Sequence, residues 1–419
     1  MEGRNTIQNE KWKRDITLFL SSQTISLFGS SLVQYAMMWY ITLSTQSGMM
    51  MTIYIICGFI PTFLLSPVAG VWADRFNRKK LIIIADGMIA FATLILAIVF
   101  MLGYDSIWLL FVMAAIRAVG AGIQTPAVGA ILPQIVPEQH LMRVNGINGT
   151  IQAVIMFVSP MVSAALLSLT TMKVIFFIDV ITAVIAIMVL VTLLKIPLHA
   201  KAAQQQEVSY LGDFKLGIQY IKQHDFLKSF FVFFAALFVL MAPVAFLTPL
   251  QVARSFGEDI WRLTATEITF SVGMMIGGII IASWGGFRNR VYTMMFAGVI
   301  MAVCTILLGI LPIFSLYLIV MALFGLAMPI FNTPTMTIIQ EKVDTDYLGR
   351  VFGVFGMIST SMMPLGMLIF GPLADVISVE KLLIGTGIFM LIVTLLINTS
   401  NSLIQAGEPV PKEMEKTVS

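Results

Sequence analysis

Four ionisable residues stand inside stretches of sequence that are otherwise apolar. Asp86, Asp179 and Glu267 are acids, and Arg117 is a cation that can pair with one of them. Burial favours the protonated form of a carboxyl group, and a nearby arginine favours the ionised form. An acid that alternates between these environments gains and loses a proton. We therefore take these four residues as candidates for proton coupling.

Polar and aromatic residues with helical spacing form a second set. Steps of three, four and four place the polar residues of segment 23–34 on one stripe of a helix, and Gln124 follows Arg117 by seven positions. An aromatic pocket with few amides suits a large amphiphilic molecule. The residues predicted to line such a cavity are Gln23, Ser26, Ser30, Gln34, Gln124, Phe234, Phe324, Phe331 and Asn332.

The composition indicates that membrane helices hold these residues. Only 11% of the 419 residues are charged, against about 25% in soluble domains, and 58% are hydrophobic. This excludes a soluble enzyme and a disordered chain, and a net charge of +3 excludes a nucleic-acid binder. The two cysteines, Cys57 and Cys304, lie in apolar runs and exclude a disulfide scaffold. No metal-ligand spacing, catalytic triad or Walker loop is found, so we expect no enzymatic activity, metal or cofactor.

Twelve segments are apolar and long enough to cross a bilayer, which takes about 20 residues. They are residues 16–43, 50–73, 80–102, 107–128, 144–168, 173–194, 227–251, 263–284, 291–311, 314–336, 351–374 and 381–401. The predicted fold class is an all-α membrane protein of twelve transmembrane helices in two six-helix bundles. The predicted domains are an N-terminal bundle (1–194), a cytoplasmic linker with an amphipathic helix (195–226), a C-terminal bundle (227–404) and a cytoplasmic tail (405–419).

The distribution of Lys and Arg predicts the orientation. Twenty of the 25 cations fall in the tails and loops on the side of the N-terminus, and only Lys173, Arg254, Arg262 and Lys381 fall on the other side. Cytoplasmic loops are enriched in Lys and Arg. We therefore expect a multi-pass protein of the plasma membrane with both termini in the cytoplasm.

The two halves of the sequence repeat. The segment 124–126 (Gln-Thr-Pro) corresponds to 332–334 (Asn-Thr-Pro), and 77–78 (Asn-Arg) corresponds to 289–290. The repeat aligns Arg117 with Gly325, so the cation is not a requirement of the fold. Halves repeated in the same orientation predict two packed bundles with a cavity between them. Gly273 and Gly277 have the small-residue spacing that predicts a close helix contact between the halves.

The loop at 70–80 reads Gly-Val-Trp-Ala-Asp-Arg-Phe-Asn-Arg-Lys-Lys. It resembles the loop signature G-x-L-A-D-R-x-G-R-[KR]-[KR] of the major facilitator superfamily, with departures at Trp72 and Asn77. The resemblance implies a gating motif made of Gly70, Asp74, Arg75, Arg78, Lys79 and Lys80. It also implies that Asp74 binds a helix N-terminus of the other half when the cytoplasmic side is closed, because a helix N-terminus attracts an anion.

Across nearly all twelve segments the chain resembles the bacterial macrolide-efflux proteins of the drug:proton antiporter group. The run Arg-Ala-Val-Gly-Ala-Gly at 117–122 resembles the R-x-x-x-G pattern of these exporters, with Gly120 where that pattern often has Gln. Ser159-Pro160 only partly matches their G-x-x-x-G-P signature. The resemblance implies export of macrolide antibiotics, and thus antibiotic resistance, in exchange for protons. It also places the helices of Asp86 and Asp179 at the periphery of the fold, which argues against either acid facing the central cavity.

Several alternatives remain open at this point. Arg117 can form a fixed ion pair, Asp86 can bond the cations of the 70–80 loop, and Glu267 can reach water. The exported compound can be a siderophore or another endogenous metabolite, and the same fold also serves uptake carriers and non-transporting sensors. The expected partners are a small amphiphilic substrate, protons and the lipid bilayer, and an ATP-binding partner protein is left open.

Overall fold

The computed structural model describes residues 2–194 and 210–408, excluding the side chains of residues 2–11, 66, 67, 71, 74, 210–214, 345 and 346. Its regular structure in these ranges is helical, and twelve helices are long and apolar enough to cross a membrane. This confirms the predicted all-α membrane fold. In a bilayer core only structures that satisfy their own backbone hydrogen bonds are stable, which is why the apolar segments are helices.

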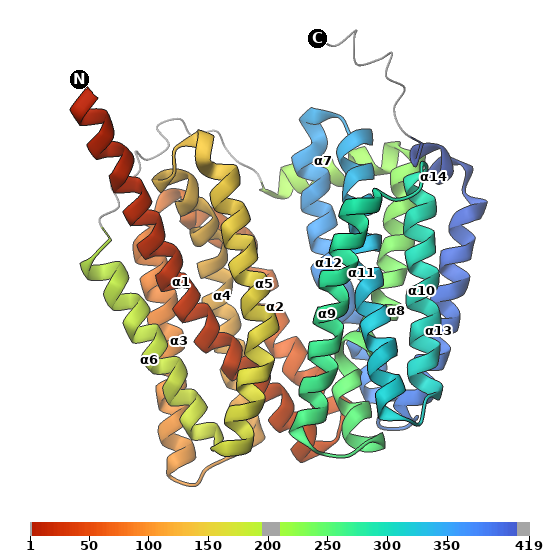
Figure 1. Ribbon diagram of the computed structural model, residues 1–419, viewed down its shortest axis with the longest axis horizontal. Helices are drawn as coiled ribbons and strands as arrows, with labels where there is room; N and C mark the ends of the chain where they lie inside the picture. The colour runs from red at the N-terminus through yellow and green to blue at the C-terminus, as the bar shows by residue number, and fades with distance from the viewer. Residues whose placement is uncertain (1, 195–209, 409–419) are drawn as a thin grey trace. The chain divides into compact units, whose positions relative to one another are not determined.

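Contacts group the chain into two compact units, Met1–Ser44 with Ile53–Gln206, and Thr45–Thr52 with Glu207–Ser419. Residues 45–52, which we placed in the N-terminal bundle, thus group with the second unit. The first unit contains most of α1 (Glu2–Thr45) and α2 (Gly48–Arg75), together with α3 (Arg78–Met101), α4 (Ile107–Ile135), α5 (Glu138–Leu169) and α6 (Met172–Thr192) (Figure 1). A buried cluster to which all six helices or their flanking residues contribute, including Phe19, Ile82 and Ile131, packs this unit.

After residues 45–52, the second unit continues with α7 (Tyr210–Gln223), which lies within the predicted linker. It continues with α8 (Asp225–Ser255), α9 (Ile260–Trp284), α10 (Arg290–Ile310), α11 (Phe314–Lys342), α12 (Thr345–Leu373), α13 (Val379–Leu396), the 3₁₀ turn η1 (Ile397–Thr399) and α14 (Asn401–Ala406) (Figure 1). Helix α9 ends at Trp284 and is followed by Gly285, whose φ of 75° is the left-handed conformation that glycine adopts easily after a helix C-terminus.

The prediction that Gly273 and Gly277 mediate a contact between the halves is wrong. A Cβ atom at Gly273 would lie 2.0 Å from the carbonyl oxygen of Ala322, and one at Gly277 would lie 2.1 Å from that of Leu326. Both carbonyls belong to α11, so the glycines let α9 approach a helix of its own unit. The spacing identifies a close helix contact but not the partner helix.

The second repeat element has a structural role in both units. Asn77 precedes α3 and accepts a hydrogen bond from the Lys80 N–H (3.1 Å), and Asn289 precedes α10 and accepts one from the Val291 N–H (2.9 Å). An asparagine at this position satisfies one of the N–H groups that a helix N-terminus leaves unpaired. Asn77, a departure from the family signature, is therefore an N-cap.

Candidate functional site

Arg117 and Asp179 form a buried ion pair in the first unit. The distance from Arg117 Nη1 to Asp179 Oδ2 is 2.6 Å, and the side chains are 11% and 1% exposed. Arg117 Nη2 donates to the Ser30 carbonyl oxygen (2.8 Å), and the Ser30 hydroxyl donates to Asp179 Oδ1 (3.3 Å). The Thr93 hydroxyl lies 3.2 Å from both Arg117 Nη1 and Asp179 Oδ2. Helices α1, α3, α4 and α6 thus each supply one residue to this cluster.

Asp86 is the centre of a second cluster, which contains no cation among its described partners. Its Oδ1 accepts hydrogen bonds from Gln124 Nε2 (2.8 Å) and the Ser26 hydroxyl (3.2 Å). Gln124 Nε2 also lies 3.4 Å from Gln23 Oε1. Asp86 Oδ2 and Gln23 Nε2 are buried and have no hydrogen-bond partner within the described part of the chain. Asp86 therefore differs from Asp179 in having only neutral donors.

The two clusters are layers two helical turns apart. Seven positions separate Gln23 from Ser30 on α1, Asp86 from Thr93 on α3, and Arg117 from Gln124 on α4. Seven residues span about 10 Å along a helix. Helix α4 follows α3 in the opposite direction, so the reversed order of its two residues keeps each in the same layer as its partners. We call these the Asp86 layer and the Asp179 layer.

The stripe predicted on α1 is divided between these layers. Gln23 and Ser26 contact the Asp86 layer, Ser30 contacts the Asp179 layer, and the exposed Gln34 uses its carbonyl oxygen to accept from the Tyr54 hydroxyl (3.1 Å). The side chains of Gln23, Ser26 and Ser30 therefore bind groups inside the first unit, whereas Gln34 does so only through its backbone. Their predicted role in binding a substrate stays a prediction. Thr93 was missed, because a single threonine in an apolar run carries no signal.

The predicted residues of the second unit do not form a matching polar cluster. Phe234, Phe324 and Phe331 are 2–3% exposed. Phe234 packs against Phe331 with ring centroids 6.3 Å apart, and Phe324 packs against Phe270 at the same distance. Asn332 is half-buried on α11. These rings belong to the interior of the second unit.

Glu267 is half-buried on α9, in a region where a neutral pair carries the polar contacts. The Tyr317 hydroxyl donates to Gln251 Oε1 (3.1 Å), and Gln251 Nε2 donates to the Leu308 carbonyl oxygen (2.7 Å). Tyr317 and Gln251 are 0% and 1% exposed. The contact between Tyr317 and Gln251 was not predicted, because spacing within one helix does not indicate a partner on another helix.

The predicted gating motif ties helix ends together within the first unit. Arg78 donates to the carbonyl oxygens of Ala73 (2.9 Å) and Ala130 (2.8 Å), and Lys79 Nζ donates to that of Leu194 (2.7 Å). Cations are favourable at the C-terminal ends of helices, where carbonyl groups lack partners. Gly70 is half-buried, and Arg75 and Lys80 are exposed. The side chain of Asp74 lies outside the described residues, so its predicted role stays a prediction.

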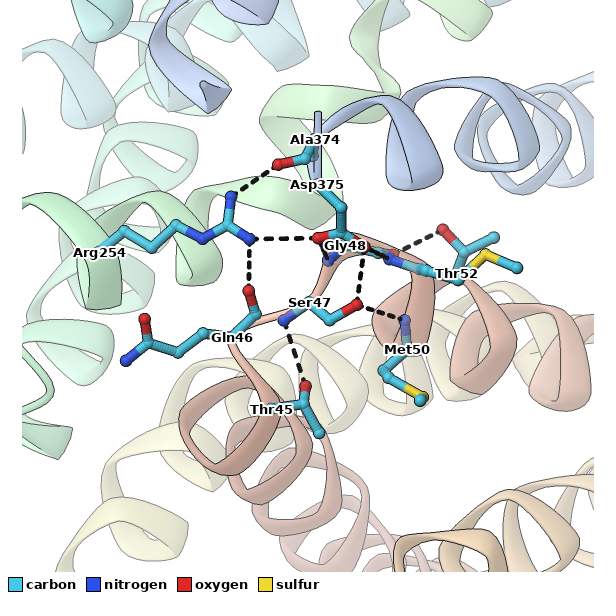
Figure 2. A network of polar contacts seen from close by, with 10 residues as sticks. Thr45, Gln46, Ser47, Gly48, Met50, Thr52, Arg254, Ala374 and Asp375 are labelled. Carbon is cyan, nitrogen blue, oxygen red and sulfur yellow. Dashed lines mark hydrogen bonds and ion pairs between the residues drawn. The ribbon is translucent and has the colours of Figure 1, made fainter. Parts of the chain in front are cut away.

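Asp375, in the loop after α12, holds the start of α2 within the second unit (Figure 2). Its carboxylate accepts from the backbone N–H groups of Gly48 (2.7 Å) and Met49 (3.0 Å) and from the Ser47 hydroxyl (2.7 Å). This arrangement satisfies N–H groups of a helix N-terminus and places a negative charge at the positive end of the helix. A Cβ atom at Gly48 would lie 2.3 Å from the Gly371 carbonyl oxygen, so the close approach requires glycine there.

Arg254 of α8 completes this group of contacts, which we call the Asp375 clamp. Arg254 Nη2 lies 3.1 Å from Asp375 Oδ1 and also donates to the Gln46 carbonyl oxygen, while Nη1 donates to that of Ala374 (2.7 Å). Burial alone would raise the pKa of Asp375. The hydrogen bonds from Met49, Ser47, Gly48 and Arg254 outweigh burial and hold this pKa below its usual value.

Twelve membrane helices in two repeat-related units, with a buried ion pair in one of them, define a multi-pass membrane protein of the transporter type. The chain belongs to the Major Facilitator Superfamily, whose sequence pattern it matches over residues 16–367. The nucleoside transporter NupG has the same fold, with a TM-score of 0.70 at 17% identity over 92% of this chain and 98% of that chain.

Curated relatives confirm the resemblance to macrolide-efflux proteins. Macrolide efflux protein A of Streptococcus pyogenes is 29% identical over 94% of this chain and 97% of its own length. Macrolide efflux protein A of Enterococcus faecalis is 31% identical over 74% of this chain and 96% of its own length. The Staphyloferrin A transporter of Staphylococcus aureus is 23% identical over 90% of this chain and 94% of its own length.

Proposed function

We propose that this protein exports amphiphilic compounds, with macrolide antibiotics first among them, across the bacterial plasma membrane in exchange for protons. The choice of macrolides rests on the two relatives named Macrolide efflux protein A. The proton exchange rests on one observation: two buried acids, Asp86 on α3 and Asp179 on α6, lie in adjacent layers, and only Asp179 is paired with an arginine among the described residues. Charged residues inside membrane helices are costly and are retained where they serve an ion or substrate pathway.

The two acids have different proposed roles because their partners differ. Arg117 lies 2.6 Å from Asp179 and supplies a positive charge that compensates its ionised carboxylate. Asp86 has no such cation among the described residues, and a carboxyl group buried without one is accommodated at least cost when it carries a proton. In our proposal Asp86 binds the transported proton, and Arg117 with Asp179 senses its arrival through α1, α3 and α4, which cross both layers.

Alternating access supplies the movement in this proposal. The proton would enter when the Asp86 layer is open to one side and leave when it is open to the other, while the substrate moves the opposite way. Asp74 would form the cytoplasmic latch implied by the family signature. An Asp74→Asn variant is expected to lose export while it remains in the membrane, and normal export by that variant would remove the latch from the mechanism.

Accumulation of a radiolabelled macrolide in cells tests the proposal. Cells that produce the protein should accumulate less macrolide than cells without it, and a protonophore should abolish the difference. Asp86→Asn should remove export, whereas Asp225→Asn, a change to an exposed acid at the start of α8, should leave it intact. Higher accumulation would indicate an uptake carrier. No flux of any compound would indicate a sensor.

Export of a siderophore is the second candidate. The chain aligns with relatives named Staphyloferrin A transporter and Enterobactin exporter EntS over 94% and 79% of their lengths. Under this alternative the protein would not change macrolide accumulation, and cells lacking it would retain a siderophore that normally appears in the medium. Measuring both compounds in the same pair of strains separates the two functions.

A further inference from the structure

A groove runs between α1 and α5 of the first unit. Its volume is about 1050 Å³, at the upper end of the range for small-molecule sites. Lys13 and Arg143 line one end, just before the apolar segment of α1 and in the second turn of α5. The rest is mainly apolar, with Ile16 and Leu20 on α1 and Ile147 and Ile151 on α5. The groove therefore has a cationic end and an apolar length.

The cationic end carries charge that is available to a ligand. Neither Lys13 nor Arg143 forms an ion pair with a carboxylate of the described residues, and no described residue that lines the groove is acidic. Arg350, the counterpart of Arg143 in the sequence repeat, instead lies over the Tyr347 ring at 5.4 Å. The charge complement of this end of the groove is an anion.

An aromatic pair marks the cationic end as a membrane boundary. Trp12 stacks on His140 with ring centroids 4.9 Å apart, and both residues line the groove. Tryptophan is enriched where membrane helices meet the headgroup region. The apolar segment of α1, residues 16–43, begins four positions after Trp12 and three after Lys13. The cations thus lie at the depth of lipid headgroups, and the apolar length extends into the hydrocarbon.

The length and the polarity of the groove fit one leaflet. The lining of α1 extends from Lys13 to Ile25, which is about 18 Å of helix, and half of a hydrocarbon core is about 15 Å. Three hydroxyl groups, of Thr17, Ser21 and Thr24, also line the groove. Those of Thr17 and Thr24 donate to carbonyl oxygens of their own helix, Lys13 (2.8 Å) and Leu20 (2.7 Å). Hydroxyls satisfied in this way can face a hydrocarbon chain without losing a hydrogen bond.

We propose that this groove binds one anionic phospholipid, with the phosphate at Lys13 and Arg143 and an acyl chain along the isoleucines of α1 and α5. Basic pockets between membrane helices bind anionic headgroups, and each cation near the headgroup strengthens the attraction. None of the groove residues is among those that we assign to substrate binding or proton coupling, so the proposed lipid site is separate from both.

Native mass spectrometry of the purified full chain in detergent measures this binding directly. The probes are phosphatidylglycerol and phosphatidylcholine with identical acyl chains. We expect one tightly bound phosphatidylglycerol. In Lys13→Gln/Arg143→Gln we expect its affinity to fall about 25-fold, toward that of phosphatidylcholine, because two headgroup contacts are removed. The matched control, Arg288→Gln/Lys381→Gln, removes one lysine and one arginine from exposed positions in the second unit and should bind as the wild type does.

A second variant tests the apolar length without changing charge. Ile147 is 44% exposed and lines the groove, so Ile147→Trp fills the space without disturbing the interior and should weaken both lipids. Inorganic phosphate at millimolar concentration should not displace phosphatidylglycerol, because it lacks the acyl chain. Unchanged affinity in the double variant would overturn the proposal. The proposal would also be overturned if these variants weakened the binding of a macrolide but not of phosphatidylglycerol, since the groove would then hold the substrate.

Discussion

The two helical units treat repeat-related positions in opposite ways. The repeat aligns Arg117 of α4 with Gly325 of α11, and Asp86 of α3 with Gly298 of α10. The first unit buries charges at these positions. In the second unit, a Cβ atom at Gly325 would lie 2.2 Å from the Phe270 carbonyl oxygen, so the helices meet there through their backbones. Close packing of small residues is an ordinary way to join membrane helices.

The comparison separates what the fold requires from what it carries in addition. Thr93 and its counterpart Thr305 both donate to the carbonyl oxygen four residues earlier, at 2.8 Å. Thr93 also contacts Arg117 and Asp179, whereas the Thr305 hydroxyl lies 3.8 Å from the sulfur of Met390. At these aligned positions the second unit therefore packs without the charges that the first unit buries. The charges of the first unit are not explained by folding alone, and this directs the search for function to them.

The ion pair of Arg117 with Asp179 in the first unit is also more deeply buried than that of Arg254 with Asp375 in the second. The Arg117 and Asp179 side chains are 11% and 1% exposed, whereas those of Arg254 and Asp375 in the Asp375 clamp are both 29% exposed. Removing one partner of a buried pair leaves an uncompensated charge, which costs far more than losing a pair that water reaches. The units should therefore respond differently to the loss of a charge.

Arg117→Met should have the largest effect, because it leaves Asp179 buried without a cation. We expect a loss of about 3–5 kcal/mol in the free energy of unfolding and a loss of export. Thermal unfolding in detergent and macrolide accumulation in cells measure the two effects. The double variant Arg117→Met/Asp179→Leu should recover the stability, since no charge remains buried, but not the export. Export restored together with stability would make the pair structural.

Gly325→Ala tests the second unit in the same way. The new Cβ would lie 2.2 Å from the backbone oxygen of Phe270, which cannot move without shifting α9, so we expect a loss of about 1–3 kcal/mol. The matched variant is Gly120→Ala in α4, where the nearest atom is the side-chain Cδ1 of Ile89 at 2.5 Å. A side chain can rotate away, so Gly120→Ala should lower the melting temperature less. Equal decreases in melting temperature for the two variants would contradict the inference that the helices of the second unit meet at Gly325 through their backbones.

The sequence predicts the parts of this architecture that depend on local composition. Hydropathy identifies the twelve spans, because each must be apolar over the thickness of the bilayer. The seven-residue spacing of Arg117 and Gln124 and the stripe on α1 also depend only on helix periodicity. The alignment of the two repeats shows, from the sequence alone, that Gly325 occupies the position corresponding to Arg117. The structure confirms the twelve membrane-spanning helices, while the functional roles of the residues on them stay predictions.

Partners that lie far apart in sequence could not be predicted. Asp375 and Gly48 are separated by 327 positions, and no pattern in either segment indicates the other. Gly273 and Gly277 likewise indicate a close helix contact without saying that it is made with α11. Thr93 acquires its role only because α3, α4 and α6 place three side chains at one point. Periodicity determines a face of a helix, whereas packing determines what that face meets.

The Asp375 clamp predicts a pH dependence for the start of α2. Because the pKa of Asp375 is held below its usual value near 3.9, the clamp contributes stability above that pH and loses it as the pH falls through the lowered pKa. Asp375→Asn should cost about 0.5–2 kcal/mol locally at neutral pH. Hydrogen exchange of residues 45–52 should be faster in the variant and independent of this titration, after correction for the intrinsic rate. Unchanged protection at neutral pH would show that the neutral hydrogen bonds suffice.

The smallest effect is expected for an ion pair near the surface of the second unit. Arg290 and Glu341 form a pair whose side chains are 27% and 31% exposed, and exposed pairs contribute about 0–1 kcal/mol. Arg290→Gln keeps the backbone N–H that donates to the Gly407 carbonyl oxygen (2.9 Å), so only the charge is removed. The melting temperature should change little, and the small difference should vanish at high salt, because exposed charges are screened. A loss comparable to that of Arg117→Met would mean that exposure does not distinguish the pairs, and the contrast between the units would fail.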